Sequence, residues 1–165
     1  MLSRDPHLQI DVIGEGESSP LMANLAEHFP KQFTYHGYMK EQGQIDQILR
    51  RSVVAIAPYD ESPGSFTQFA DPQKLKYYAS NGLPIALTNV APAAEEMSNC
   101  GAAILLSRAD GYDKWVDAVF HWLDNSDDWF TAAKSSYNYA LNFERKYVYV
   151  NTFSALLDLV AKKTK

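Results

Sequence analysis

Residues 70–89, ADPQKLKYYASNGLPIALTN, predict a helix that leads directly into a strand. Asp71 is a favourable N-cap residue, and Pro72 suits the first position of a helix. Apolar positions then recur every three or four residues as far as Gly82, which stops the helix. The run PIALT (84–88) follows at once and is typical of a strand. A helix that feeds a strand in this way is the repeating unit of an α/β fold.

Lys74 has an unusual position for a lysine, because it falls in the first turn of this predicted helix. The helix dipole favours negative charge there, so the lysine costs stability, by roughly a few tenths of a kcal/mol. One interpretation is that Lys74 and the free amides of the helix start bind an anionic group such as a phosphate. The other is that Lys74 is a solvated side chain paired with Asp71 or Glu61.

The same alternation of strands and helices extends over the rest of the chain. Because successive strands are separated by helices, the sequence predicts a doubly wound parallel sheet with additional C-terminal helices. Strands are expected at 8–14, 33–37, 53–58, 84–88 and 102–106, with helices at 21–29, 42–52, 71–82 and 91–99. Three helical stripes follow: Trp115, Val119, Trp122 and Leu123; Trp129, Ala133, Tyr137 and Ala140; and Phe153, Leu156, Leu157 and Val160.

Composition narrows the class of protein. The 165 residues fit one domain, and a net charge of −5 argues against general nucleic-acid binding, which needs a basic surface. Cys100 is the single cysteine, so a disulfide framework is excluded. The sequence shows no signal-like run and no stretch of about 18 apolar residues, so we expect a cytoplasmic protein.

Ligands of doubly wound folds bind beyond the carboxyl ends of the strands. The loop PYDESPGSFTQFAD (58–71) is long for a strand-to-helix connection, which usually takes about 2–6 residues. It combines glycine, proline, hydroxyl and aromatic residues. This composition favours a binding loop over a plain connector.

Other candidate groups have simpler interpretations. The segment IGEGES contains a G-x-G, but Glu15 and Glu17 would repel a pyrophosphate, so a tight turn is expected. His36 and His121 have no partner at metal-ligand spacing, and we expect no metal site. Cys100 has no histidine partner in the sequence and is expected in the core.

Asp60 and Glu61 are adjacent carboxylates in the long loop. Such a pair could act as a general acid and base. Adjacent carboxylates in a loop are more commonly solvated charges, and both interpretations stay open.

The order VIGEG, YHGYMK, ILRRSVVAIAPY and DPQKLKYYASNGLPIALTN resembles the C-terminal, nucleotide-sugar-binding domain of GT-B glycosyltransferases. Among these, the sequence looks most similar to bacterial polysaccharide enzymes of the xanthan glucuronosyltransferase type. The resemblance covers residues 8–145, and its most specific part is P-x-K-L-x-x-Y-x-x-x-G-L-P at 72–84. It implies a Rossmann-like GT-B half.

The resemblance assigns the diphosphate and ribose contacts to the helix of the opening stretch. Lys74 matches the lysine that meets the donor diphosphate, with the amides of Gln73 and Lys74 behind it. Tyr77 stands where the family has a Glu or Gln near the ribose. The paired glutamates of many such enzymes are replaced here by Phe69 and Tyr77.

The base and sugar contacts are assigned to two loops. Tyr38 and Met39 match the segment that contacts the base. The loop that closes over the phosphates and the sugar is matched by Tyr59, Ser62, Gly64 and Ser65.

The resemblance also implies a place in a larger enzyme. Residues 1–165 are expected to form the donor-binding domain, as a fragment of a two-domain enzyme whose catalytic residues and acceptor site lie in an N-terminal domain. The substrate would be a UDP-sugar or a related nucleotide-sugar, with no metal or other cofactor, and the acceptor a saccharide or a lipid-linked saccharide. The full-length enzyme is expected in the cytoplasm, peripheral to the inner face of the membrane, and this part alone is expected to be inactive.

Two alternatives remain open. A flavodoxin-like or receiver-like interaction module would share the α/β pattern, but a receiver needs an aspartate at the end of its third strand, where this sequence has Pro58 and Tyr59. A nucleotide-sugar epimerase domain is the other, and its histidine and carboxylate set is not identifiable in the sequence.

Overall fold

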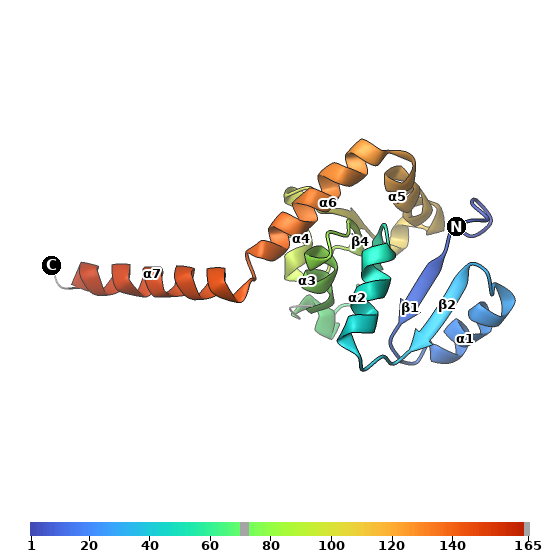
Figure 1. Ribbon diagram of the computed structural model, residues 1–165, viewed down its shortest axis with the longest axis horizontal. Helices are drawn as coiled ribbons and strands as arrows, with labels where there is room; N and C mark the ends of the chain where they lie inside the picture. The colour runs from blue at the N-terminus through green and yellow to red at the C-terminus, as the bar shows by residue number, and fades with distance from the viewer. Residues whose placement is uncertain (70–72, 164–165) are drawn as a thin grey trace. The chain divides into compact units, whose positions relative to one another are not determined.

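Strands and helices alternate along the chain, as the sequence predicts (Figure 1). The computed structural model describes residues 1–69 and 73–163. The predicted cap at Asp71 and Pro72 lies outside the described residues. The chain divides into two compact units, Met1–Ser52 and Val53–Lys165.

The first unit holds two parallel strands and two helices. Its elements are β1 (Ile10–Ile13), α1 (Ser19–His28), β2 (Phe33–Gly37) and α2 (Gln42–Arg51). Ile10 pairs with Phe33, and the register shifts between Val12 and Ile13. Of the four positions at helical spacing, Ile45, Ile48, Leu49 and Ser52, the structure buries Ile48 and Leu49.

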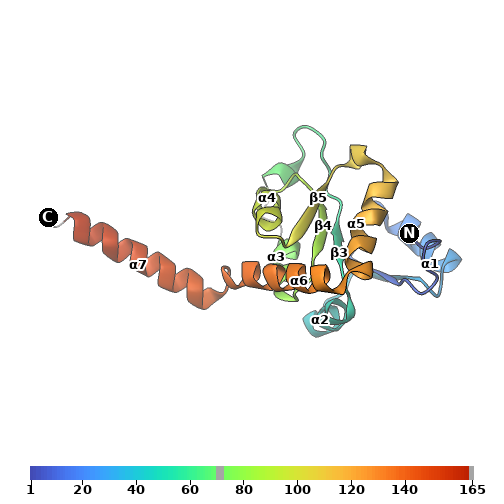
Figure 2. The same ribbon diagram turned by 90° about the horizontal axis from the view of Figure 1, so that it is seen from above.

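The second unit contains a three-stranded parallel sheet in the order β3-β4-β5. The strands are β3 (Ala55–Ala57), β4 (Ile85–Thr88) and β5 (Ala103–Leu106). Around them lie η1 (Phe66–Gln68), α3 (Gln73–Ser80), α4 (Pro92–Asn99), η2 (Arg108–Asp110), α5 (Tyr112–Asp124), α6 (Ser126–Leu141) and α7 (Arg145–Lys163). Helices α3 and α4 cover one face of the sheet and α5 the other (Figure 2), which is the doubly wound arrangement that the sequence predicts.

The core of this unit is centred on β4. All four residues of that strand are buried, as expected for a central parallel strand covered on both faces. Leu75 and Ala79 of α3 and Met97 of α4 are fully buried on one side. On the other side, a cluster of Ala86, Leu106, Ala118, Trp122 and Ala132 forms, with Trp115 and Trp129 packed against it.

Helix α6 buries a different face from the one that the sequence pattern indicates. The predicted stripe includes Tyr137, which is half exposed. The buried residues are Ala132, Ser136 and Tyr139. The physical reason is a hydrogen bond: the fully buried Ser136 Oγ donates to the carbonyl of Leu83 at 2.7 Å.

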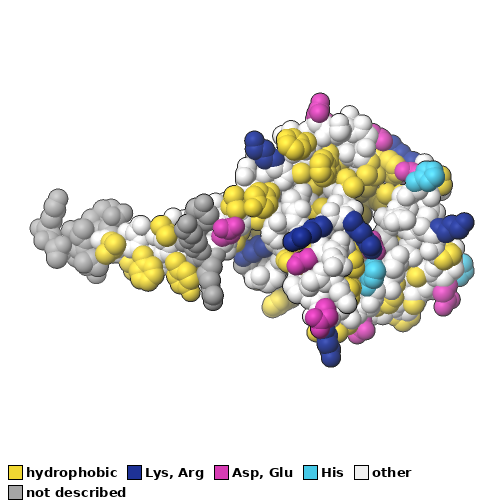
Figure 3. Space-filling view, in the orientation of Figure 1, with side chains coloured by type: hydrophobic (Ala, Val, Ile, Leu, Met, Phe, Trp, Pro, Cys, Tyr) yellow, Lys and Arg dark blue, Asp and Glu magenta, His cyan; other side chains and the backbone are white. Residues whose placement is uncertain are grey.

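Helix α7 leaves its apolar residues exposed. The predicted stripe there includes Phe153, Leu156 and Leu157, and all three are more than half exposed. Apolar side chains follow one another along this helix in Figure 3. Within the described residues, none of the helices combines the length and apolarity needed to cross a membrane.

The expectation that Cys100 lies in the core is wrong. Cys100 is exposed, at the carboxyl end of α4, and its Sγ contacts the carbonyl of Met97 at 3.3 Å. Met97 takes the fully buried position on that helix instead. The turn that follows is made by Gly101, whose φ of +80° favours glycine.

Candidate functional site

The candidate site lies at the carboxyl end of β3 and β4, where the sequence analysis expects ligands. Tyr59 stands two residues after β3, and its backbone carbonyl accepts a hydrogen bond from Thr88 Oγ1 at 3.1 Å. Thr88 is the fully buried last residue of β4. This bond fixes Tyr59 to the neighbouring strand. Sequence reasoning missed Thr88, although a hydroxyl residue at the end of the apolar run IALT was the available signal.

The side chain of Tyr59 carries a hydroxyl whose hydrogen-bonding capacity is unused in the described part of the chain. Its hydroxyl is buried, and it has no hydrogen-bond partner among the described residues. Burial, and then the neighbouring Tyr78, raise the pKa of the Tyr59 hydroxyl well above its ordinary value. The group is therefore a neutral phenol at physiological pH, with an O–H available for donation.

Lys74 lies beside this tyrosine. It is exposed in the first turn of α3, and its Nζ lies 5.5 Å from the centroid of the Tyr59 ring. This is within the range of a cation–π interaction, which reaches to about 6 Å. The alternative pairing with Glu61 is not found, because that carboxylate is bonded elsewhere. Asp71, the other suggested partner, lies outside the described residues.

The carboxylates of the long loop are hydrogen-bonded within the protein. Asp60 Oδ1 accepts from the amide of Ser62 at 3.1 Å and from its Oγ at 2.7 Å. These bonds, with the Arg108 guanidinium at 3.5 Å, hold the pKa of Asp60 below its ordinary value. Asp60 therefore stabilises the loop as an ionised acceptor, and nothing in its setting equips it as a general acid.

Glu61 ties the long loop to the segment after β5. Its Oε2 accepts from the amide of Arg108 at 2.6 Å and from Ser107 Oγ at 3.2 Å. Ser107 also caps η2, where the side chain of Asp110 accepts from the Ser107 amide. The interpretation of Glu61 as a purely solvated charge is therefore wrong.

The other loop residues predicted for donor binding lie together after Glu61. The amide of Ser65 donates to the carbonyl of Ser62 at 3.0 Å, and so closes a tight turn. Gly64 occupies that turn with a φ of +81°, and open space surrounds the position of a Cβ there. Gln68 Nε2 also donates to the Ser62 carbonyl, at 3.2 Å.

Gln73 and Tyr77 face a groove on the side of α3. This cavity, of about 480 Å³, is lined on its other side by the end of α6 and the start of α7. Asn81, which the helical wheel places beside Lys74 and Tyr77, donates to the carbonyl of Tyr77 at 3.0 Å. Asn81 therefore provides a hydrogen-bond donor for one of the carbonyls in the last turn of α3.

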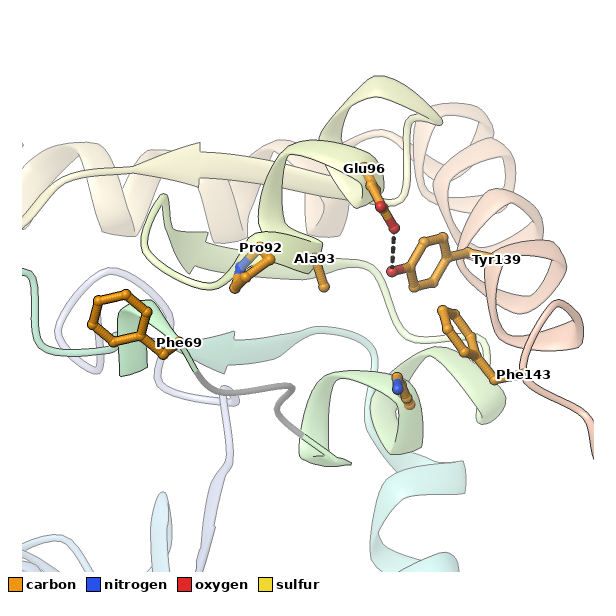
Figure 4. Close-up of a pocket in the computed structure, with 7 residues that line it drawn as sticks. Phe69, Pro92, Ala93, Glu96, Tyr139 and Phe143 are labelled. Atoms are coloured by element: carbon orange, nitrogen blue, oxygen red, sulfur yellow. Dashed lines mark hydrogen bonds between the residues drawn. The ribbon is translucent and has the colours of Figure 1, made fainter. Parts of the chain in front are cut away.

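A second cavity, of about 240 Å³, lies between α3, α4 and the end of α6 (Figure 4). Tyr139 donates its hydroxyl to Glu96 Oε2 at 3.1 Å, as the dashed line in the figure marks. Phe143 lies beside Tyr139, and Lys76 Nζ is 4.4 Å from the Phe143 ring centroid. Phe69 lines the opposite end.

Tyr38 and Met39 belong to the first unit. They follow β2, where Gly37 turns the chain with a φ of +61°. Tyr38 is 66% exposed and so is open to a ligand.

His36 of β2 is partnered within the first unit. Its Nε2 lies 2.6 Å from Asp11 Oδ1, which also accepts from Arg51 at 3.1 Å. These contacts fix the His36 imidazole within the first unit. Within residues 1–69 and 73–163, no cluster of three or more His, Cys, Asp or Glu could hold a metal ion.

Comparison with known proteins places this geometry in a fold. No protein-family model matches the sequence. No curated protein matches it either. Among solved structures, the chain is similar to WaaG, a glycosyltransferase involved in lipopolysaccharide biosynthesis, with a TM-score of 0.58 and 17% sequence identity over 80% of this chain.

The fold is therefore the Rossmann-like fold of a GT-B glycosyltransferase half, as the sequence resemblance implies. The similarity covers 33% of WaaG, so this chain spans about a third of that protein.

Proposed function

We propose that this chain is the donor-binding half of a glycosyltransferase, and that it binds the diphosphate of a nucleotide-sugar at the start of α3. The observation that carries the proposal is the juxtaposition of the exposed Lys74 ammonium with Tyr59, at the carboxyl edge of the sheet. The GT-B fold supports it, because the sequence resemblance assigns the diphosphate contact to this lysine.

The chemistry of glycosyl transfer suits these groups. Transfer breaks the bond between the anomeric carbon and the β-phosphate oxygen, so negative charge develops on the leaving diphosphate. The Lys74 ammonium and the amides at the start of α3 would stabilise that charge. The unpartnered Tyr59 hydroxyl would add one neutral donor.

The remaining assignments extend the same proposal. Tyr77 would donate to the ribose, Tyr38 and Met39 would contact the base, and the loop of Ser62 and Ser65 would close over the sugar. The donor would be a UDP-sugar, used to build a bacterial polysaccharide of the xanthan type or another saccharide. The acceptor, free or lipid-linked, would be bound by a part of the enzyme outside this chain, so we expect no transfer by the chain alone.

Titration with UDP, followed by amide NMR shifts, tests the proposal. Half of a two-domain site should bind UDP with a dissociation constant on the order of mM. We expect shifts centred on Tyr38, Met39, Tyr59 and residues 73–77. Parallel titrations with GDP and ADP test the choice of base.

The matched variants are Lys74→Ala and Lys134→Ala. Both remove one exposed lysine from a helix of the second unit. We expect Lys74→Ala to weaken UDP and inorganic pyrophosphate binding by about tenfold or more, because one charge-assisted contact to the diphosphate is lost. Lys134→Ala should bind like the parent protein. Equal affinities for the two variants would remove Lys74 from the site.

A further inference from the structure

The cavity between α3, α4 and the end of α6 has no role in the proposed donor binding (Figure 4). We call it the α3–α4 cavity. Its volume is about 240 Å³. Sites for drug-sized ligands usually have about 300–1,000 Å³, so this cavity fits a single ring rather than a whole nucleotide. Among the residues that the structure describes, none of those assigned to the donor lines it.

Aromatic rings lie at both ends of the α3–α4 cavity. Phe69 lies at one end, Tyr139 and Phe143 lie at the other, and Pro92 and Ala93 are found between them (Figure 4). The Phe69 side chain is 79% exposed and that of Phe143 is 39% exposed, so a ligand can reach both rings. The face of an aromatic ring is electron-rich and attracts the slightly positive C–H groups of a ligand.

Two side chains of opposite charge line the same cavity. Glu96 Oε2 accepts the hydroxyl of Tyr139 at 3.1 Å, which orients the carboxylate, and a carboxylate can accept several further bonds. The half-buried Lys76 places its Nζ 4.4 Å from the centroid of the Phe143 ring, and its ammonium group has three N–H donors. The cavity therefore combines apolar ring faces with one strong acceptor and one strong donor.

This combination selects a class of ligand. A purely apolar ring would remove water from Glu96 and Lys76 without giving either a new partner, which is costly. A ligand with a net negative charge would be repelled by Glu96, and one with a net positive charge by Lys76. A neutral sugar ring avoids both costs, because its C–H faces suit the aromatic rings and its hydroxyls both accept and donate hydrogen bonds.

The α3–α4 cavity lies on a different flank of α3 from the proposed diphosphate contact. Lys74 and Lys76 are two positions apart, so their side chains leave the helix about 200° apart. Lys74 lies beside Tyr59 of the loop after β3, whereas Lys76 lies beside Phe143 at the end of α6. A ligand in the cavity therefore does not compete with the donor for Lys74.

We propose that the α3–α4 cavity binds one ring of a neutral saccharide, separately from the nucleotide-sugar. The ring stacks on Phe69 or Phe143, and its hydroxyls bond to Glu96 and Lys76. Such a site would hold a saccharide chain on the donor-binding half. That biological role rests on the proposed function, but the binding itself does not.

Titration with single-ring sugars, followed by amide NMR shifts, tests the proposal. The probes are methyl β-D-glucopyranoside, methyl β-D-galactopyranoside and methyl α-D-mannopyranoside. We expect at least one to bind with a dissociation constant on the order of 1–10 mM, with shifts centred on the amides of Ala93, Glu96, Tyr139 and Phe143. No localised shift with any of the three at tens of millimolar would overturn the proposal.

Cyclohexanol tests the class of ligand. It is a ring of similar size with a single hydroxyl, so it should bind more weakly than the best of the three sugars. Equal or tighter binding of cyclohexanol would show that the cavity takes an apolar ligand, and would overturn the assignment to a saccharide.

The matched variants for stacking are Phe69→Ala and Phe66→Ala. Both remove a strongly exposed phenyl ring from the same loop, and only Phe69 lines the cavity among these two. We expect Phe69→Ala to weaken sugar binding by about fivefold or more and Phe66→Ala by less than about twofold. Equal effects of the two variants would contradict stacking on Phe69.

The matched variants for hydrogen bonding are Glu96→Gln and Glu95→Gln, at neighbouring positions of α4. Because bonds to a charged acceptor are the stronger ones, Glu96→Gln should weaken sugar binding by about threefold or more, and Glu95→Gln should not. UDP affinity should be the same in Glu96→Gln as in the parent protein. A lack of UDP binding would therefore contradict the donor site alone, and a lack of sugar binding the α3–α4 cavity alone.

Discussion

At the residue scale, the acidic side chains of the second unit stabilise loops. Asp60 accepts from Ser62, Glu61 accepts from Ser107 and Arg108, and Asp110 accepts from Lys114 Nζ at 2.7 Å. Each carboxylate therefore acts as a hydrogen-bond acceptor for nearby donors. The sequence could not distinguish this role from a catalytic one, because the partners of Glu61 lie more than 40 positions away.

Asp110 gives a pH-dependent prediction. The Lys114 ammonium and the Ser107 amide hold its pKa below the ordinary value of 3.8. A carboxyl whose pKa is lowered by folding stabilises the protein above its unfolded pKa, and this contribution is lost as the pH falls through the folded pKa. Asp110→Asn should therefore lower the urea midpoint at pH 7, and the difference from the parent protein should shrink below pH 3.8.

The control for this prediction is Asp124→Asn, which removes an exposed carboxylate at the last residue of α5. It should not reproduce the pH-dependent difference. If the difference in urea midpoint between Asp110→Asn and the parent protein stayed constant down to acid pH, the ionised form of Asp110 would not be the source of the stabilisation.

At the element scale, nearly all helices and strands could be predicted from periodicity and turn residues. The strand at 33–37 has the expected bounds, and the others are shorter than predicted by one to three residues. The two short helices η1 and η2 were missed, because three residues are too few for a periodic signal. The buried face of α6 was misplaced by one position, because a hydrophobicity pattern assigns a serine to the solvent side.

Ser136 gives the prediction for this helix. Ser136→Ala should lower the free energy of unfolding by about 1–3 kcal/mol, because it leaves the buried Leu83 carbonyl without its donor. Urea denaturation measures the loss. Ser135→Ala, the same change one position earlier, should have a much smaller effect. If both variants lowered the free energy of unfolding equally, the loss would come from a serine-to-alanine change anywhere in this helix, and not from this hydrogen bond.

At the scale of the whole molecule, the fold class follows from the alternation of elements, whereas the division after Ser52 has no signal in the sequence. Residues 48–57, ILRRSVVAIA, run from α2 into β3 without a glycine or proline linker. The proposed donor site is only partly predictable from the sequence, because it depends on contacts between distant segments. The pairing of Lys74 with Tyr59 depends on how β3 and α3 pack within the second unit.

Hydrogen exchange should distinguish the two units. All four residues of β4 are buried, whereas β1 has none that is fully buried and α1 buries no residue. Amides in well-packed central strands open least often. We expect the amides of residues 85–88 to exchange most slowly, and those of residues 10–13 much faster. Similar protection of β1 and β4 would contradict this ranking.

The bond between Glu61 and the start of η2 has a mechanical consequence. One carboxylate accepts hydrogen bonds from both Ser107 and Arg108. The motions of the loop that follows β3 and of the segment that follows β5 are therefore coupled. A ligand that immobilises the first would damp the motion of the second, even though it touches no atom there. The carboxyl edge of the sheet would then stiffen as a unit when a ligand binds there.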